Sequence, residues 1–227
     1  MVFSVAIDGP AGAGKGTIAK YISQKFSFAH LDTGLLYREV GRLVIEESID
    51  TLDVVRLETV AQTIDPGHLD EKVLRNEHIA AIASQVAIIP SVRRVLTQKM
   101  RDFTDNVTSD FQGVILDGRD VGTVILPGAD VKIFVTADEK VRAHRRTKEM
   151  SISADVIELK NILEDIKTRD ARDQNRQADP LQMAVEAILL DTTFYDIETV
   201  CRKAEEIVEH ALLVYHGNDY MLKTSVC

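Results

Sequence analysis

The residues with the clearest chemical meaning lie near the N-terminus, in the run Gly9-Pro-Ala-Gly-Ala-Gly-Lys-Gly-Thr17. Its glycines let the backbone curl so that successive N–H groups point into one anion-sized hollow. Lys15 adds a cation that can reach the outer phosphates of a nucleotide. The run therefore predicts a phosphate-binding loop, made by Gly9, Pro10, Ala11, Gly12, Ala13, Gly14, Lys15, Gly16 and Thr17.

The loop departs from the general pattern at one position. Ser or Thr usually follows the lysine directly and holds Mg²⁺ through its hydroxyl. Here Gly16 follows, and the hydroxyl comes one residue later on Thr17. We expect Mg²⁺ to be held mainly by phosphates and water, which this ion tolerates. The sequence therefore predicts no protein metal ligand.

Two groups of arginines form a second feature with chemical meaning. Arg142, Arg145 and Arg146 occur together, and Arg169, Arg172 and Arg176 follow at spacings of three and four. Such spacings place each group on one face of a helix. Salt-bridged surface helices are one reading. Opposite a phosphate-binding loop we favour an electrostatic clamp, because arginine forks match phosphate oxygens.

These features together indicate two anionic substrates. An acceptor that is itself a phosphate needs no catalytic base, because its oxygens are already mostly ionised near neutrality. Its difficulty is repulsion between two polyanions, which lysine, Mg²⁺ and several arginines can offset. The pattern therefore favours a phosphate acceptor. Arg38 could bind such a phosphate or lie on the surface, and its local sequence does not decide.

Alternating strand and helix patterns must position these residues. Apolar, β-branched runs predict strands at 2–8, 28–31, 113–117, 131–136 and 187–190. Helical patterns between them predict a parallel, doubly wound sheet of the three-layer α/β/α class. We expect a single domain with its core at 1–42, 108–140 and 177–227, a helical insertion over the acceptor at about 43–107, and a lid at about 141–176 with its tip at Met150–Leu163.

Composition limits the class of protein further. The 27 basic and 36 acidic residues give a net charge of −9, which argues against non-specific nucleic-acid binding. No apolar run approaches the roughly 20 residues of a membrane span. Neither the two cysteines nor the six histidines have metal-ligand spacing. We expect a cytoplasmic monomer that acts on small molecules.

Several segments together resemble bacterial cytidylate kinases. They are GPAGAGKGT, DTGLLYR, ASQVA followed by PSVRR, LDGRDVGTVILPGADVKIFV, RAHRR and RDARDQNR, in this order from residue 4 to about residue 200. The DGRD segment and the arginine-rich lid segment separate this family from adenylate kinases. The resemblance implies transfer of the ATP γ-phosphate to CMP or dCMP with Mg²⁺.

The resemblance also implies roles for individual residues. The loop from Gly9 to Thr17 would bind the ATP phosphates. Catalysis would rest on the cations Lys15, Arg119, Arg145, Arg172 and Arg176. The acceptor nucleotide would be bound by Asp32, Thr33, Arg38, Ser84, Arg93, Arg119, Asp120, Arg169 and Asp173. Within that set, Ser84, Arg93 and Asp120 would read the cytosine edge, and Arg38 and Arg119 would hold the CMP phosphate.

The chain departs from the family in its insertion, which is shortened to about Asp65–Glu77 before the ASQVA segment and has poor strand character. This departure bears on how sharply UMP is rejected. Two alternatives stay open: a kinase with another small acceptor, such as UMP, AMP or shikimate, and a nucleotide-binding protein without turnover. An assay across acceptors separates all three.

Overall fold

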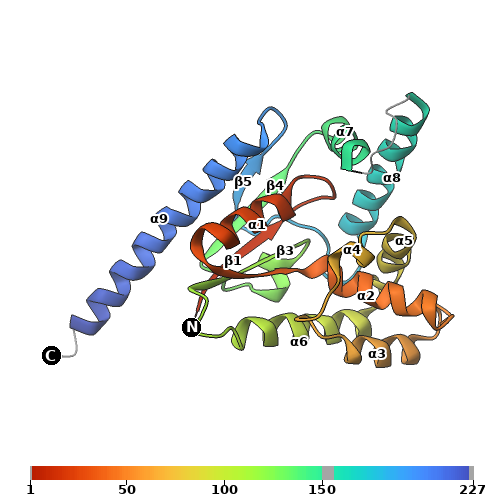
Figure 1. Cartoon of the computed structure of the whole chain (residues 1–227), viewed down its shortest axis with the longest axis horizontal. Helices are drawn as coiled ribbons and strands as arrows, with labels where there is room; N and C mark the ends of the chain where they lie inside the picture. Colours follow the sequence, from red (N-terminus) through yellow and green to blue (C-terminus); the bar gives the residue numbers. More distant parts are fainter. Residues whose placement is uncertain (1, 150–155, 225–227) are drawn as a thin grey trace.

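A five-stranded parallel sheet forms the centre of the molecule (Figure 1). The computed structural model describes residues 2–149 and 156–224. The strands are β1 (Phe3–Asp8), β2 (Phe28–Asp32), β3 (Gly113–Gly118), β4 (Val131–Thr136) and β5 (Ile188–Asp191). Their order is β2-β3-β1-β4-β5, and every pairing is parallel. The five predicted strands and the α/β class are confirmed.

Helices connect the strands and cover both faces of the sheet. They are α1 (Lys15–Phe26), α2 (Thr33–Glu46), α3 (Val54–Thr63), α4 (Glu71–Leu74), α5 (Glu77–Val86), α6 (Pro90–Asp105), α7 (Glu139–Glu149), α8 (Val156–Asn175) and α9 (Ile197–Thr224), together with a short π-helical turn, η1 (Val121–Ile125).

The core lies in two layers, one on each side of the sheet. Successive side chains of a strand point to opposite faces. Val5 and Ile7 of β1 accordingly pack into a cluster with residues of α1 and α9. Ala6, between them, belongs to a second cluster with residues of α2, α3 and α6. The predicted three-layer arrangement follows from this alternation.

The region from residue 43 to residue 107 is described throughout, and it contains helices and turns but no strand. The stretch with poor strand character forms the single-turn helix α4. α5 packs so closely on α2 that a Cβ atom at Gly41 would come within 2.9 Å of the Ile79 carbonyl oxygen. Glycine at position 41 therefore permits the close contact between α2 and α5.

α7 and α8 pack against each other beside the carboxyl ends of the strands. Residues 150–155 of the expected lid tip lie outside the described residues. α8 ends at Asn175, so the prediction that Arg176 shares one helical face with Arg169 and Arg172 is wrong. The chain turns back there because Leu181 N–H donates to the Asp173 carbonyl (2.8 Å) and the Leu181 side chain is buried.

In residues 2–149 and 156–224 no single helix is long and apolar enough to cross a membrane. One helix pair, α5 with α6, passes that test jointly, but it is bent by 106°.

Candidate active site

The glycine-rich loop joins the central strand β1 to helix α1. Gly9 has a φ of +146°, and a Cβ atom there would lie 1.9 Å from the Val135 carbonyl oxygen, so no other residue fits. Gly14 occupies the N-cap of α1 and has no side chain to compete for the first N–H groups of the helix. Those N–H groups and the positive end of the helix dipole form a site for an anion.

Lys15 is the first residue of α1, and its side chain is buried. Its Nζ donates to the Pro10 carbonyl oxygen at 2.9 Å, so the ammonium lies over the loop. Burial and then repulsion from Arg119 lower the pKa of Lys15 to about 7, although Asp117 and Asp32 oppose this. An anion in the loop would restore the charge of this lysine.

Two carboxylates end the neighbouring strands β2 and β3 beside Lys15. Asp32 and Asp117 are partners in the parallel register. Burial and then the charge of Asp117 raise the pKa of Asp32. Asp117 also contacts His30, with 2.8 Å between Nε2 and Oδ2. Among the described residues no group of three or more Asp, Glu, His or Cys side chains could hold a metal by itself, so a cation here would need further oxygen ligands.

Asp32 has a second role, because its side chain caps α2 by accepting from Gly34 N–H at 3.0 Å. The next residue, Thr33, is buried and donates its hydroxyl to the Asp117 carbonyl oxygen at 2.9 Å. Thr33 thereby joins the end of β2 to the end of β3.

Three predicted arginines converge near these strand ends. Arg119 directly follows β3, and its Nε lies 2.9 Å from Asp173 of α8. Arg38 of α2 donates to the Leu74 carbonyl oxygen at 2.9 Å. Arg169 of α8 forms no hydrogen bond or ion pair with any residue that the structure describes. Burial, followed by repulsion from Arg119, lowers the pKa of Arg169 to about 10.

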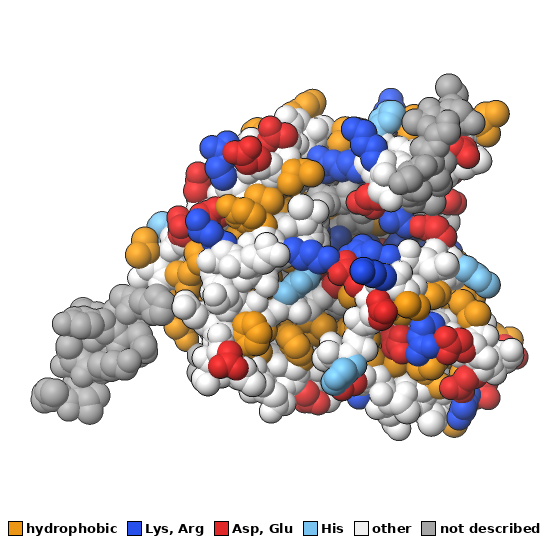
Figure 2. Space-filling model, viewed as in Figure 1, with side chains coloured by type: hydrophobic (Ala, Val, Ile, Leu, Met, Phe, Trp, Pro, Cys, Tyr) orange, Lys and Arg blue, Asp and Glu red, His pale blue; other side chains and the backbone are white. Residues whose placement is uncertain are grey.

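This positive charge is only partly balanced. Burial alone would raise the pKa of Asp173, but Arg119 and Arg169 together lower it below its usual value. Figure 2 shows lysine and arginine side chains gathered in the hollow of this face. An acidic molecule that gathers cations in one hollow, where Arg169 has no ion pair with any described residue, is suited to bind a phosphate there.

A buried polar cluster adjoins the arginines. Arg93 of α6 is 2 % exposed and pairs through Nη2 with Asp120, which lies just after β3. Its Nε is 2.7 Å from Asp179. Asp120 is also 3.3 Å from Nη2 of Arg176. The ring of Tyr37 lies 5.6 Å from the Arg93 guanidinium carbon. The structure thus brings together the predicted residues Arg93, Asp120 and Arg176.

Ser84 is held by a different predicted residue. Its hydroxyl accepts from Nη1 of Arg172 at 2.7 Å, which links α5 of the insertion to α8. No hydrogen bond joins Ser84 to Arg93 or Asp120 among the described residues. The three residues expected to read the base therefore lie in two separate contacts, Ser84 with Arg172 and Arg93 with Asp120.

The arginines of α7 dock this helix on the phosphate-binding loop. Arg145 donates to the Thr192 hydroxyl (2.8 Å) and carbonyl (2.7 Å), and reaches the Ala13 carbonyl at 3.5 Å. Arg142, which the sequence placed in the cluster but not in the site, is buried and donates to the Ala11 carbonyl at 3.1 Å. Arg142 also pairs with Asp170 of α8 at 2.5 Å. The loop, α7 and α8 thus share one hydrogen-bond and ion-pair network.

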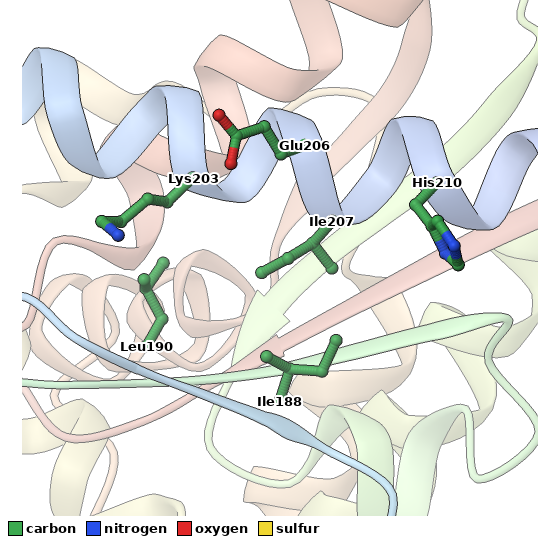
Figure 3. Close-up of a pocket in the computed structure, with 6 residues that line it drawn as sticks. All are labelled: Ile188, Leu190, Lys203, Glu206, Ile207 and His210. Carbon is green, nitrogen blue, oxygen red and sulfur yellow. The ribbon is translucent and has the colours of Figure 1, made fainter.

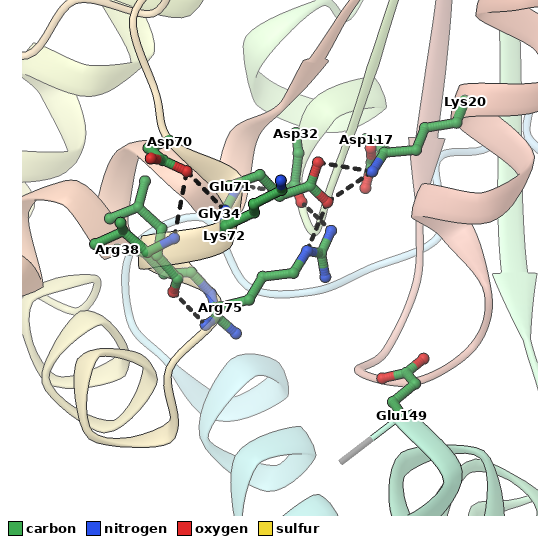
Figure 4. Close-up of polar contacts among 12 residues, drawn as sticks. Lys20, Asp32, Gly34, Arg38, Asp70, Glu71, Lys72, Arg75, Asp117 and Glu149 are labelled. Carbon is green, nitrogen blue, oxygen red and sulfur yellow. Dashed lines mark hydrogen bonds and ion pairs between the residues drawn. The ribbon is translucent and has the colours of Figure 1, made fainter. Parts of the chain in front are cut away.

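Sequence reasoning missed several residues of the site. Asp8, at the end of β1, accepts from the N–H groups of Val121 and Gly122, each at 2.7 Å. Arg75 follows α4 and lies between Asp32 (3.4 Å) and Glu71 (2.6 Å), while Lys20 of α1 reaches the same Glu71 (Figure 4). A charged residue ending the central strand was a usable signal for Asp8. Arg75 had none in the local pattern.

A second hollow lies away from these residues, between β5 and α9 at the edge of the sheet (Figure 3). It is lined by Ile188, Leu190, Lys203, Glu206, Ile207 and His210. None of these was a predicted site residue, and the surface is mostly aliphatic.

The fold and the site define a class of protein. A parallel sheet with a glycine-rich, lysine-bearing loop after its central strand, opposite an arginine-rich helical arm, is the arrangement of the P-loop kinases. Within that class, the chain belongs to the cytidylate kinase family, whose model matches residues 5–210.

Curated relatives agree with the family assignment. The chain is 45% identical over 205 residues to the cytidylate kinase of Bradyrhizobium sp. (strain ORS 278), covering 90% of this chain and 95% of that one. It is 41% identical over 215 residues to the cytidylate kinase of Brucella suis biovar 1 (strain 1330), covering 95% and 96%.

Solved structures resemble the chain in fold alone. The shikimate kinase of Bacteroides thetaiotaomicron matches with a TM-score of 0.50 and 13% identity, over 92% of this chain and 99% of that one. An uncharacterized protein of Eubacterium ventriosum ATCC 27560 matches with a TM-score of 0.52 and 13% identity, over 92% and 98%.

Proposed function

We propose that the protein transfers the γ-phosphate of ATP to CMP or dCMP and releases ADP with CDP or dCDP. One observation carries this proposal most strongly: Arg119 and Arg169 face the region of Lys15, and the charge of Arg169 is not neutralised by an ion pair with any described residue. A second phosphate beside the loop would satisfy these cations.

The donor would bind in the glycine-rich loop. Its phosphates would accept hydrogen bonds from the N–H groups at the start of α1, and Lys15 would contact the β- and γ-phosphates. Arg142 and Arg145 hold α7 on the loop through the carbonyl oxygens of Ala11 and Ala13. Binding of ATP to the loop would therefore act directly on the position of the lid, which we place at about 141–176.

The acceptor would bind between the insertion, at about 43–107, and the lid. Its phosphate would lie against Arg38, Arg119 and Arg169, and its ribose hydroxyls near Asp173. The chemistry then consists of positioning and charge neutralisation, because the acceptor oxygen is already ionised. Arg172 and Arg176 would contribute to closing the lid on the phosphates.

The base would be read at the cluster of Arg93 and Asp120. Cytosine presents an amino donor, which a carboxylate such as Asp120 can accept, next to acceptors that an arginine can satisfy. Uracil presents a carbonyl oxygen where cytosine has the amino group, so its oxygen would face a carboxylate. Ser84 would complete the contact from α5.

Mg²⁺ fits the residues present. Asp32 and Asp117 are two neighbouring carboxylates, and burial followed by repulsion from Asp117 raises the pKa of Asp32. A cation between phosphates and these carboxylates would relieve that repulsion. When bound, Mg²⁺ supplies charge neutralisation between the two nucleotides. Asp32 and Asp117 would hold it through water and phosphate oxygens.

The test is a coupled ADP-release assay with CMP, dCMP, UMP and AMP at matched concentrations. We expect CMP and dCMP to be phosphorylated fastest. Faster phosphorylation of UMP or AMP would overturn the choice of acceptor. ATP binding without turnover of any acceptor would instead show a nucleotide-binding protein that lacks the activity.

A further inference from the structure

Asp179 lies in the turn between α8 and β5, in a conformation that few residues adopt. Its φ is +51°, in the left-handed region, where Asp and Asn are tolerated better than most other residues. Its carbonyl oxygen accepts from Nε of Arg176. The turn closes two residues later, where Leu181 N–H donates to the Asp173 carbonyl at 2.8 Å. These contacts fix the backbone of the turn, and the backbone sets the direction in which the Asp179 side chain leaves it.

That side chain points to the centre of the proposed base-reading cluster. Its Oδ2 is 2.7 Å from Nε of Arg93, which lies on α6 of the insertion. Every arginine has five N–H donors. Arg93 uses three of them, on Asp179, the Ala87 carbonyl oxygen and Asp120, which leaves two for a ligand.

The carboxylates of Asp120 and Asp179 hold Arg93 from two different elements. Asp120 follows β3 and is fixed to the sheet, whereas Asp179 follows the lid helix α8. Together with Arg176 they make a cluster of two positive and two negative charges. Loss of the Asp179 carboxylate would leave the buried Nε of Arg93 unpaired and the cluster with one excess positive charge.

We propose that Asp179 is a positioning residue that determines acceptor specificity. It fixes the plane of the Arg93 guanidinium so that the two remaining N–H donors face the base. It also links binding of the base to the C-terminal end of the lid helix α8. The proposal rests on the proposed function, since it takes the acceptor base to lie at Arg93 and Asp120. A planar guanidinium held at Nε can turn only as a unit, so its free donors keep one direction.

Two variants separate the carboxylate from the backbone turn. Asp179→Gly removes the carboxylate and suits the positive φ, while Asp179→Asn suits it as well and retains an oxygen that accepts from Arg93. Ser48→Gly is the matched control, because Ser48 has a φ of +52° on the exposed turn after α2, away from the site.

The measurements are KM and kcat for CMP, UMP and ATP, with CMP dissociation constants by calorimetry. For Asp179→Gly we expect KM for CMP to rise about tenfold, and the preference for CMP over UMP to fall about tenfold. We expect kcat and KM for ATP to stay within about twofold. Asp179→Asn should lose about threefold in the same preference, and Ser48→Gly should match the parent.

A merely structural role would lower the urea midpoint without changing the CMP-to-UMP preference, and that result would overturn the proposal. If Asp179→Gly does not fold, Asp179→Asn decides, and an unchanged preference in it has the same meaning. Failure of the parent chain to phosphorylate CMP overturns the proposed function, whereas normal CMP phosphorylation with unchanged preference in both variants overturns the role of Asp179 alone.

Discussion

Lys15 is a buried cation whose charge depends on what occupies the phosphate-binding loop. Its pKa of about 7 means that much of it is neutral in the free protein near neutral pH. Phosphates bound beside it favour the ammonium form and raise its pKa. ATP binding should therefore take up a proton at this residue.

Proton uptake can be measured by titration calorimetry of ATP in buffers of different ionisation enthalpy. At pH 8, where free Lys15 is mostly deprotonated and ATP is fully ionised, we expect uptake approaching one proton. The uptake should vanish near pH 5.5, because Lys15 is then already protonated in the free protein. Lys15→Ala should abolish the signal at pH 8, and uptake that persists in this variant would assign the proton to another group.

Lys15 is also expected to stabilise the transferred phosphoryl group. Lys15→Ala should lower kcat by a factor of about 100 or more, the usual effect of removing a donor at developing charge. CMP binding should change little, because the acceptor contacts lie elsewhere. Lys25→Ala, on the exposed end of the same helix, is the control. Near-normal turnover in Lys15→Ala would remove this lysine from the mechanism.

At the scale of elements, Asp8 joins the central strand to the start of η1. Its carboxylate accepts from Val121 and Gly122, and so fixes the segment that carries Arg119 and Asp120. Asn at position 8 can accept through its oxygen but turns a donor toward the second N–H group. At pH 4, Asp8→Asn should therefore cost about 1–3 kcal/mol of stability, and at neutral pH it should raise KM for CMP more than for ATP.

The pH dependence gives a separate check on Asp8. Burial raises its pKa from 3.8 to about 6, against the two N–H groups. The folded state therefore holds this proton more tightly, so this group favours folding below about pH 4 and loses its contribution as pH rises through 6. The parent should lose up to roughly 3 kcal/mol relative to Asp8→Asn across this window, by urea unfolding. A difference in unfolding free energy between the two proteins that stays constant with pH would contradict the raised pKa of Asp8.

One of the contacts between the insertion and the lid is a hydrogen bond that a double-mutant cycle can isolate, beside the ion pair of Arg146 with Glu77. Arg172 of α8 donates to Ser84 of α5 at 2.7 Å. If this contact forms part of closure, Ser84→Ala and Arg172→Ala should couple by about 0.5–2 kcal/mol in kcat/KM for CMP. Additive effects of the two substitutions would show that they act independently.

For the whole molecule, the proposed substrates would bind between the sheet, the insertion and the lid, and would therefore stabilise the folded state. A ligand that binds the folded state alone stabilises it by about 2.7 kcal/mol at 100 times its dissociation constant. For a chain of 227 residues this should raise Tm by about 5–10 °C. CMP should act at lower concentration than UMP in a thermal-shift titration. Equal effects of the two nucleotides would argue against base reading in the free enzyme.

Local patterns determined much of this protein. The alternation of strand and helix patterns was sufficient to predict the parallel sheet, and the glycine-rich loop with its lysine predicts a phosphate site. Both depend on neighbours in the chain, through backbone propensity and side-chain alternation. The end of α8 was misplaced, because the bond from Leu181 to Asp173 and the burial of Leu181 stop the helix.

Tertiary structure decided which charged groups share a contact. Asp8 and Val121 are 113 positions apart, and Arg93 and Asp179 are 86 apart. The local sequence does not identify the partners of these aspartates, because the cost of burying a charge and the partner that offsets it exist only after the elements have packed. The sequence by itself predicted a phosphate site at Lys15 with arginines around it. Packing decided how each arginine is held.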